Sequence, residues 1–172
     1  MNARGVDRAE IFRDELDYTR FLRTFNHVLR AKDWTCRVYC LMANHYHLIV
    51  TTAQANLAAG MQVLNGTHAR RFNERYGRFG HVFQGRYDAR LIEDEEYLSE
   101  ACTYVLANPV RAGLCERPEE WRWSSAYDGF AVSGTSQTTP SGGSVTSAEN
   151  GCSCHGTGSD STPPRLPTSD PP

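Results

Sequence analysis

Residues 34–52, WTCRVYCLMANHYHLIVTT, are rich in β-branched and aromatic side chains and have one short polar break, at Ala43–Asn44. Two runs of this kind around a short break predict an antiparallel β-hairpin. The second run carries His45 and His47 at alternate positions. Alternate residues of a strand share a face, so both imidazoles project the same way from Cα atoms roughly 6.5–7 Å apart. We expect the intervening Tyr46 to face the core.

The histidine pair has two interpretations. Both rings can converge on one cation, and neutral imidazole nitrogens suit Mn²⁺, Zn²⁺ or a loosely held Mg²⁺ better than Ca²⁺. The alternative is a pair of hydrogen-bonded histidines on a sheet surface, because His-x-His alone is a weak motif. The hairpin by itself leaves both open.

Helical spacing of apolar residues surrounds the hairpin and predicts three helices, over residues 14–31, 56–76 and 93–109. Asp14 is a suitable N-cap for the first helix. Gly77 provides a C-terminal stop for the second. Pro109 is expected to end the third, because proline lacks the backbone N–H that a helix needs.

Two further segments complete the predicted domain. Residues 85–93 alternate loosely and predict a third strand, and the segment that follows the last helix carries Trp121, Trp123 and Phe130, which we expect to pack back on the domain. Helices interspersed with hairpin strands indicate an α+β fold, an antiparallel sheet with helices packed against one face.

Composition divides the chain after residue 130. Residues 1–130 hold nearly all the large apolar side chains, whereas 131–172 are mostly Ser, Thr, Gly and Pro and predict a disordered tail. Cys152 and Cys154 lie in this tail beside a histidine. A metal cluster is one interpretation, and exposed thiols without a function are the favoured one. The chain shows no signal peptide and no membrane span, so we expect a cytoplasmic protein with reduced cysteines and no membrane partner.

Positive charge is concentrated in residues 68–90, although the whole chain has a net charge of −2. This stretch has only Glu74 and Asp88 against six arginines, Arg70, Arg71, Arg75, Arg78, Arg86 and Arg90. Phenylalanines and tyrosines are interleaved with them. The combination suits a phosphate backbone with unpaired bases, and the alternative is a solvated helix face.

Tyr104 and Asn108 form a second constellation in the third predicted helix. Residues four apart lie on one helix face, so the phenol and the amide are neighbours. A tyrosine can attack phosphorus to form a covalent phosphotyrosyl link, and an amide oxygen can complete a metal site. Taken alone, an aromatic residue in an amphipathic helix is also explained by packing.

Several blocks occur in an order that resembles the single-tyrosine HUH transposases, in particular the REP-associated tyrosine transposase branch. RGVDRAEIF, LMANHYHLIV, FQGRYDARLIEDEEYL, YVLANPVRAGL and PEEWRWSSA resemble successive blocks of that family. The resemblance covers about residues 4–130. It implies a ferredoxin-like (RRM-like) HUH fold.

The resemblance also implies a function. His45 and His47 occupy the positions of the paired metal-binding histidines, Tyr104 that of the nucleophile, and Asn108 that of the residue completing the site. Members cut single-stranded DNA that carries a small hairpin, with Mg²⁺ or Mn²⁺, and form a 5′-phosphotyrosine link. The arginines between residues 70 and 90 are the expected surface for the phosphates of that hairpin. The working unit is expected to be a monomer or a homodimer.

The chain departs from the family pattern at three points, one of which is the low-complexity tail over residues 131–172, which resembles nothing in the family. Ala43 replaces a proline at the hairpin turn, which we expect to cost little. A strand of about ten residues usually precedes the first block, whereas this chain starts MNARGV, so we expect a truncated first strand and an unpaired edge beside the histidine strand. The alternative function is therefore an inactive copy that only binds hairpin DNA. A weaker third is a metal-dependent phosphodiesterase that uses water as nucleophile.

Overall fold

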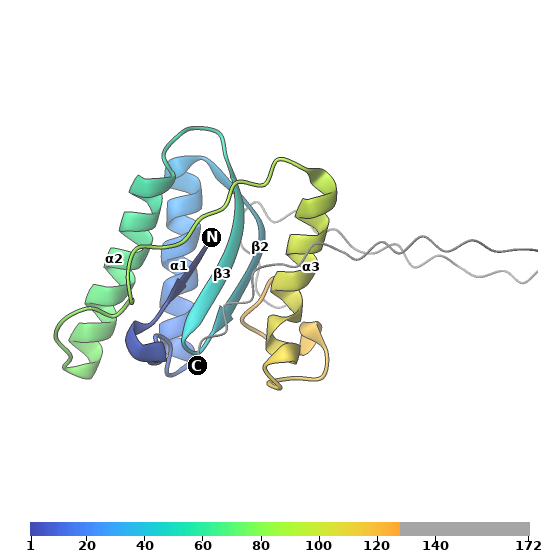
Figure 1. The fold of residues 1–172 in the computed structure, drawn as a ribbon. Helices are drawn as coiled ribbons and strands as arrows, with labels where there is room; N and C mark the ends of the chain where they lie inside the picture. The colour runs from blue at the N-terminus through green and yellow to red at the C-terminus, as the bar shows by residue number, and fades with distance from the viewer. Residues whose placement is uncertain (128–172) are drawn as a thin grey trace, which may run out of the picture. The chain divides into compact units, whose positions relative to one another are not determined.

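A three-stranded antiparallel sheet lies between helices in the computed structural model, which describes residues 1–127 (Figure 1). Its elements in chain order are β1 (Asn2–Arg4), the 3₁₀ turn η1 (Val6–Arg8), α1 (Glu15–Lys32), β2 (Trp34–Met42), β3 (His45–Thr52), α2 (Leu57–Tyr76), α3 (Glu95–Arg111) and the 3₁₀ turn η2 (Pro118–Glu120). The α+β fold class is therefore confirmed. The predicted boundary at residue 130, Phe130 and the tail with its cysteines lie outside the described residues.

The hairpin forms as predicted and places the histidines in the middle of the sheet. The strand order is β1-β3-β2, so the histidine strand β3 has a neighbour on each side. On one side Met42 pairs with His45 and Cys40 with His47. On the other, the antiparallel strand β1 places Arg4 opposite His45 and Asn2 opposite His47. Both histidines are thus fixed by two ladders.

The strand β1 is short, as expected, but it covers the part of β3 that carries the histidines. Met1 extends the pairing, because its amino group donates to the Leu48 carbonyl at 2.8 Å and its carbonyl accepts from the Leu48 N–H at 2.9 Å. The expectation of an unpaired edge beside the histidines is therefore wrong over residues 45–48. Three residues of strand and a terminal residue are enough to satisfy the backbone there.

The prediction of a strand at residues 85–93 is wrong. The chain there runs along the outer side of β1 and makes isolated bridges, Asn2 to Asp88 and Gly5 to Phe83. Asn2 and Asp88 exchange two backbone hydrogen bonds of 2.9 Å. Because β1 is only three residues long, it offers too short an edge for a continuous fourth strand.

Two helices cover one face of the sheet. The side chain of Asp14 caps α1 as predicted, accepting from the backbone N–H groups of Leu16 and Asp17, and Gly77 ends α2 in the left-handed conformation at φ 59°. Tyr46 and Leu48 of β3 point into this layer and are fully buried, as expected of the positions that alternate with the histidines. The main core lies here.

The third helix covers the opposite face, so the prediction of helices on one face is wrong. Val105 of α3 packs in a second cluster with Val38, Cys40 and Met42 of β2. In Figure 1, α3 stands across the sheet from α1 and α2. With layers on both sides, β2 is buried almost continuously rather than at alternate residues.

Pro109 does not end α3, contrary to the prediction, because the helix continues to Arg111. The proline removes the backbone donor that the Val105 carbonyl would otherwise accept from. The side-chain amide of Asn108 takes its place and donates to the Val105 carbonyl at 3.3 Å and to the Tyr104 carbonyl at 3.2 Å. A side chain one residue before the proline thus satisfies the helix interior.

The segment after α3 packs back on the domain, as predicted, along the free edge of β2. The Trp121 indole N–H donates to the Leu41 carbonyl at 2.9 Å, and Trp123 stacks on Tyr18 with ring centroids 4.5 Å apart. A bridge joins Cys40 to Ser124. Among residues 1–127, no helix has the length and apolar character that crossing a bilayer requires.

Candidate active site

His45 and His47 project from β3 toward the layer of α3. Their ring centroids are 5.1 Å apart, with the planes nearly perpendicular. Nδ1 of His45 lies 2.6 Å from Oδ1 of Asn44. The amide oxygen can only accept, so Nδ1 carries the proton and Nε2 presents its lone pair. This is the arrangement in which a neighbouring acceptor orients a metal-binding imidazole.

The surroundings of the two rings keep them uncharged. Burial lowers the pKa of His45 to about 4, and the positive charge of Arg4 lowers it further. Burial also lowers the pKa of His47 to about 3, helped by His45, by the amino terminus and by Arg4. A protonated imidazole cannot bind a cation, so both rings are ready as ligands throughout the neutral pH range.

Tyr104 reaches the same place from α3. Its ring centroid is 6.5 Å from that of His47, and 38% of the residue is exposed, so the phenol is open to a substrate. The guanidinium of Arg111 lies 4.6 Å from the centre of the Tyr104 ring. Sequence reasoning did not select Arg111, although its position seven residues after Tyr104, two turns along the same helix face, is a usable signal.

Asn108 lies one helical turn after Tyr104. Its amide nitrogen is turned toward the backbone carbonyls of Tyr104 and Val105, so Oδ1 is the end of the side chain that can serve a cation. The Pro109 that follows makes this orientation necessary, because it frees the Val105 carbonyl.

The donors fit an open cation site rather than a closed one. Within residues 1–127, no group of three His, Cys, Asp or Glu side chains is placed to hold a metal ion. The contacts bring the two neutral imidazoles together with Tyr104, and Asn108 lies one helical turn further along α3. The remaining positions would go to water or to substrate phosphate oxygens, which Mg²⁺ and Mn²⁺ prefer as ligands.

The six arginines predicted to bind DNA do not share one surface. Arg70, Arg71 and Arg75 lie on α2, in the layer opposite α3. The guanidinium of Arg78, in the loop after α2, lies 5.7 Å from the Phe72 ring centre. Arg86 is exposed, and Arg90 donates to the Tyr97 hydroxyl of α3 at 3.2 Å.

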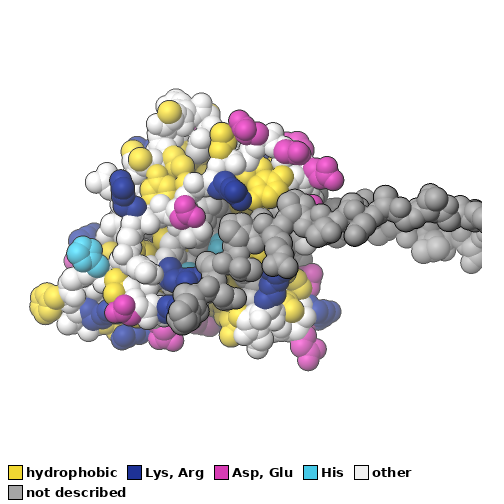
Figure 2. Space-filling view, viewed as in Figure 1, with side chains coloured by type: hydrophobic (Ala, Val, Ile, Leu, Met, Phe, Trp, Pro, Cys, Tyr) yellow, Lys and Arg dark blue, Asp and Glu magenta, His cyan; other side chains and the backbone are white. Residues whose placement is uncertain are grey.

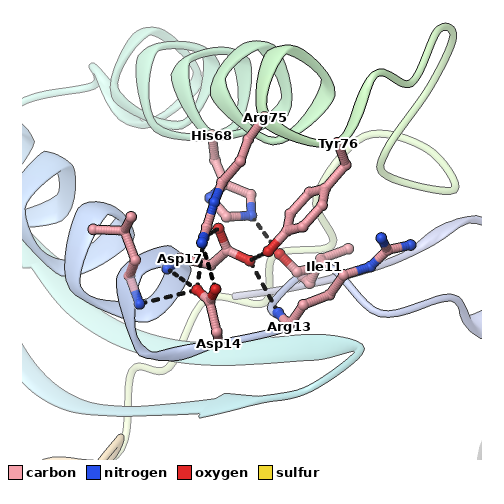
Figure 3. A network of polar contacts seen from close by, with 8 residues as sticks. Ile11, Arg13, Asp14, Asp17, His68, Arg75 and Tyr76 are labelled. Atoms are coloured by element: carbon pink, nitrogen blue, oxygen red, sulfur yellow. Dashed lines mark hydrogen bonds and ion pairs between the residues drawn. The ribbon is translucent and has the colours of Figure 1, made fainter.

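Arg75 belongs to a network that ties α2 to the start of α1 (Figure 3). It pairs with Asp14 and, at 2.7 Å, with the buried carboxylate of Asp17, which also accepts from the Tyr76 hydroxyl at 2.8 Å. The Arg75 guanidinium is the main reason that the pKa of Asp14 lies below its usual value. Nearby, Nε2 of His68 donates to the Ile11 carbonyl at 2.7 Å. Arg75 therefore has a structural role.

Comparison with known proteins bears on the fold and on the family of the chain. A solved structure described as a REP-associated tyrosine transposase bound to a REP hairpin has a similar fold, with a TM-score of 0.59, 15% sequence identity and 72% of each chain covered. No curated protein sequence matches the chain. The family described as "Transposase IS200 like" matches residues 4–108, a stretch that includes both histidines, Tyr104 and Asn108. The chain belongs to this family of IS200-like transposases.

Proposed function

We propose that this transposase cleaves and rejoins single-stranded DNA carrying a hairpin, through a 5′-phosphotyrosine link to Tyr104. DNA transposition is the process that this chemistry would serve. The same proposal includes a cytoplasmic location.

The observation that carries the proposal is the meeting of Tyr104 with the histidine pair. Tyr104 comes from α3 and the histidines from β3, and the ring centroids of Tyr104 and His47 are 6.5 Å apart. A packing role would bury the tyrosine, whereas its exposed fraction is 38%. The Arg111 guanidinium beside the ring adds a positive charge where a phosphate would approach.

The proposed step is a direct displacement at phosphorus. The Tyr104 oxygen, having lost its proton, forms a bond to phosphorus, and the bond from phosphorus to the 3′ oxygen breaks. The departing 3′ oxygen takes up a proton and leaves as a free hydroxyl. Attack by a 3′ hydroxyl on the phosphotyrosine reverses the step, so the energy of the phosphodiester is kept for rejoining.

A divalent cation, Mg²⁺ or Mn²⁺, fits the donors His45, His47 and Asn108. Bound there, it would polarise the scissile phosphate and offset the charge that develops during displacement. The protein's own contribution is to hold both imidazoles neutral, to orient His45 through Asn44, and to present the phenol beside His47.

The test is replacement of Tyr104 by phenylalanine. Incubation with single-stranded hairpin DNA and Mn²⁺, followed by a denaturing gel, should show a covalent protein–DNA adduct for the natural chain and none for Tyr104→Phe, with DNA affinity unchanged. Tyr97→Phe, seven residues earlier in α3, is the matched control and should still form the adduct. An adduct in the Tyr104→Phe protein would refute the assignment of the nucleophile.

Two outcomes would point to the rival functions. Binding of the hairpin by the natural chain without any cleavage would indicate a binding protein. Cleaved DNA without an adduct would indicate a phosphodiesterase that uses water. Cleavage that is unchanged in both His45→Ala and His47→Ala would remove the metal role from the histidines.

A further inference from the structure

The short strand β1 brings a positive side chain to the histidine pair. Ala3, in the middle of β1, is buried in the main core, so its neighbour Arg4 lies on the other face of the sheet. Arg4 pairs directly with His45. Residues opposite one another in antiparallel strands share a face and have Cβ atoms about 4.5–5.5 Å apart. The Arg4 side chain therefore begins beside His45, on the face that carries both histidines.

The backbone around Arg4 is fixed in this position. The Arg4 carbonyl accepts from the Gln84 N–H at 2.9 Å, and the Gly5 N–H donates to the Asn44 carbonyl at 2.9 Å. The side-chain oxygen of Asn44 is the group that orients His45. Arg4 and His45 are thus anchored to the same turn, and the arginine is positioned relative to the histidines before any ligand binds.

The positive charge of Arg4 has no counter-charge in the described part of the chain. Arg4 is half-buried, and it forms no ion pair with a carboxylate of those residues. Its charge lowers the pKa of both His45 and His47, and no described carboxylate raises either pKa. A charge that is partly removed from water is costly unless an opposite charge accompanies it. An anionic ligand would supply that charge.

The acidic side chains of the domain gather elsewhere. On the face drawn in Figure 2 they lie over the start of α3, where the sequence has Glu93, Asp94, Glu95 and Glu96. Tyr104 is about 12 Å further along the helix than Glu96. Glu100, one turn before Tyr104, is exposed and does not raise the pKa of either histidine. The charge that acts on the histidine pair is therefore positive.

The histidines lie between Arg4 and Tyr104. Strand β1 borders β3 on one side, whereas α3 packs over β2, which borders β3 on the other side (Figure 1). The Arg111 guanidinium contacts the Tyr104 ring, so guanidinium groups flank the histidine pair from two directions. A phosphate placed over the imidazoles would have Arg4 on one side and the attacking phenol on the other.

The charge of Arg4 also acts on a cation. Like charges repel appreciably in a partly buried site, so Arg4 opposes the binding of a divalent ion to His45 and His47. A phosphate that contacts both removes this repulsion, because its oxygens accept from a guanidinium and are ligands that Mg²⁺ and Mn²⁺ prefer. The cation and the phosphate should therefore each bind more tightly when the other is present.

We propose that Arg4 binds the non-bridging oxygens of the scissile phosphate and thereby makes cation binding depend on the DNA strand. This inference rests on the proposed function, which supplies the cation site and the phosphodiester substrate. The free protein would hold Mn²⁺ weakly, and the strand that is to be cleaved would complete the site. The guanidinium would also offset the negative charge that develops at the phosphate while Tyr104 attacks.

The test is a titration of the full chain with Mn²⁺, with and without a ten-nucleotide oligo-dT, in which electron paramagnetic resonance measures the free ion. Oligo-dT should tighten Mn²⁺ binding by the natural chain. Arg4→Gln should raise the Mn²⁺ affinity of the free protein about fivefold, because the repulsion is removed, and should reduce the gain from oligo-dT by a similar factor. A side chain that only supports the fold would change the affinity in the opposite direction, because its loss would disturb the histidines.

Two variants serve as controls. Arg4→Lys keeps the charge and should retain both the weak Mn²⁺ binding of the free protein and the gain from oligo-dT. Arg23→Gln removes the same charge from an exposed position of α1, on the other face of the sheet, and should leave both values unchanged. Circular dichroism and the unfolding midpoint of each variant must match those of the natural chain. If Arg4→Gln fails to fold, Arg4→Met replaces it, because it removes the charge and keeps an apolar stem.

An unchanged or lower Mn²⁺ affinity of free Arg4→Gln would overturn the proposal, and so would an undiminished gain from oligo-dT. The titration requires no cleavage, so it is independent of the adduct test with Tyr104→Phe. An adduct together with an unaltered Mn²⁺ response in Arg4→Gln would leave the proposed function standing and remove the role of Arg4. The expected Mn²⁺ response without any adduct would support the role of Arg4 and remove Tyr104 as the nucleophile.

Discussion

At the residue scale, Asn108 shows how one side chain can serve the fold and the site together. Its nitrogen replaces the backbone donor missing at Pro109, which leaves its oxygen for the cation ligand role that we propose. We expect Asn108→Ala to lose about 1 kcal/mol of unfolding free energy, the net value of a hydrogen bond, and to weaken Mn²⁺ binding. Urea unfolding and a Mn²⁺ titration measure the two effects.

Pro109→Ala separates the two roles. Alanine restores the backbone N–H to the Val105 carbonyl, so the cost in stability of Asn108→Ala should shrink in the Pro109→Ala background while the loss of Mn²⁺ affinity persists. An equal stability cost in both backgrounds would mean that Asn108 does not stand in for the missing donor.

Individual residues also show which features could be predicted from the sequence and which could not. Strand alternation placed His45 and His47 on one face and Tyr46 in the core, because that period follows from backbone geometry alone. It could not show that Arg75 is held by Asp14 and Asp17, since those partners lie far away in the sequence. The prediction that Arg75 binds DNA rested on its charge alone and stays a prediction.

At the element scale, the packing of α2 on the hairpin depends on a glycine. A Cβ on Gly60 would lie 2.3 Å from Cη2 and Cζ2 of the Trp34 ring. That ring is buried, and its N–H donates to Oδ1 of Asn56 at 2.6 Å, so it has little freedom to move. We expect Gly60→Ala to lower the unfolding free energy by roughly 1–3 kcal/mol, although alanine favours helices.

Gly66 is the control within the same helix. A Cβ there meets no atom within 4 Å, so Gly66→Ala should raise the unfolding free energy by about 0.5–1 kcal/mol through helix propensity alone. Chemical denaturation of both variants is the measurement. A stabilising Gly60→Ala would show that α2 does not approach the hairpin as closely as described.

The elements themselves were predictable wherever one periodicity ran for several turns. α1 and α2 begin and end within a residue or so of the prediction, because their caps and stops are local. Residues 85–93 have strand-like composition, yet strand formation depends on the length of the partner, and β1 supplies only three residues. The position of α3 on the second face likewise depends on tertiary structure. The nearly unbroken apolar character of β2 did indicate a strand that is covered on both faces.

At the scale of the whole molecule, the family resemblance supplied what periodicity could not. It joined the histidines to Tyr104, two features that local patterns leave unrelated, and the family match over residues 4–108 confirms the membership. The structure then places the Tyr104 ring 6.5 Å from that of His47, centroid to centroid.

Burial of three histidines makes the stability of the whole domain sensitive to acid. Burial is the largest reason that the pKa values of His45, His47 and His68 are lowered, the first two to about 4 and about 3. In the unfolded chain each of these histidines takes up a proton near pH 6.5, whereas in the folded chain it stays neutral at that pH. The stabilisation is therefore fully present above pH 6.5 and is lost as the pH falls toward 4, by about 1.4 kcal/mol per pH unit for each histidine.

Urea unfolding between pH 7 and pH 4.5, in EDTA so that no metal contributes, should show this decline. His45→Gln/His47→Gln should remove most of the dependence of the unfolding free energy on pH, because glutamine takes up no proton. Of the three buried histidines, only His68 then contributes. If the unfolding free energy of the double variant falls with pH as steeply as that of the natural chain, burial does not keep the two histidines neutral.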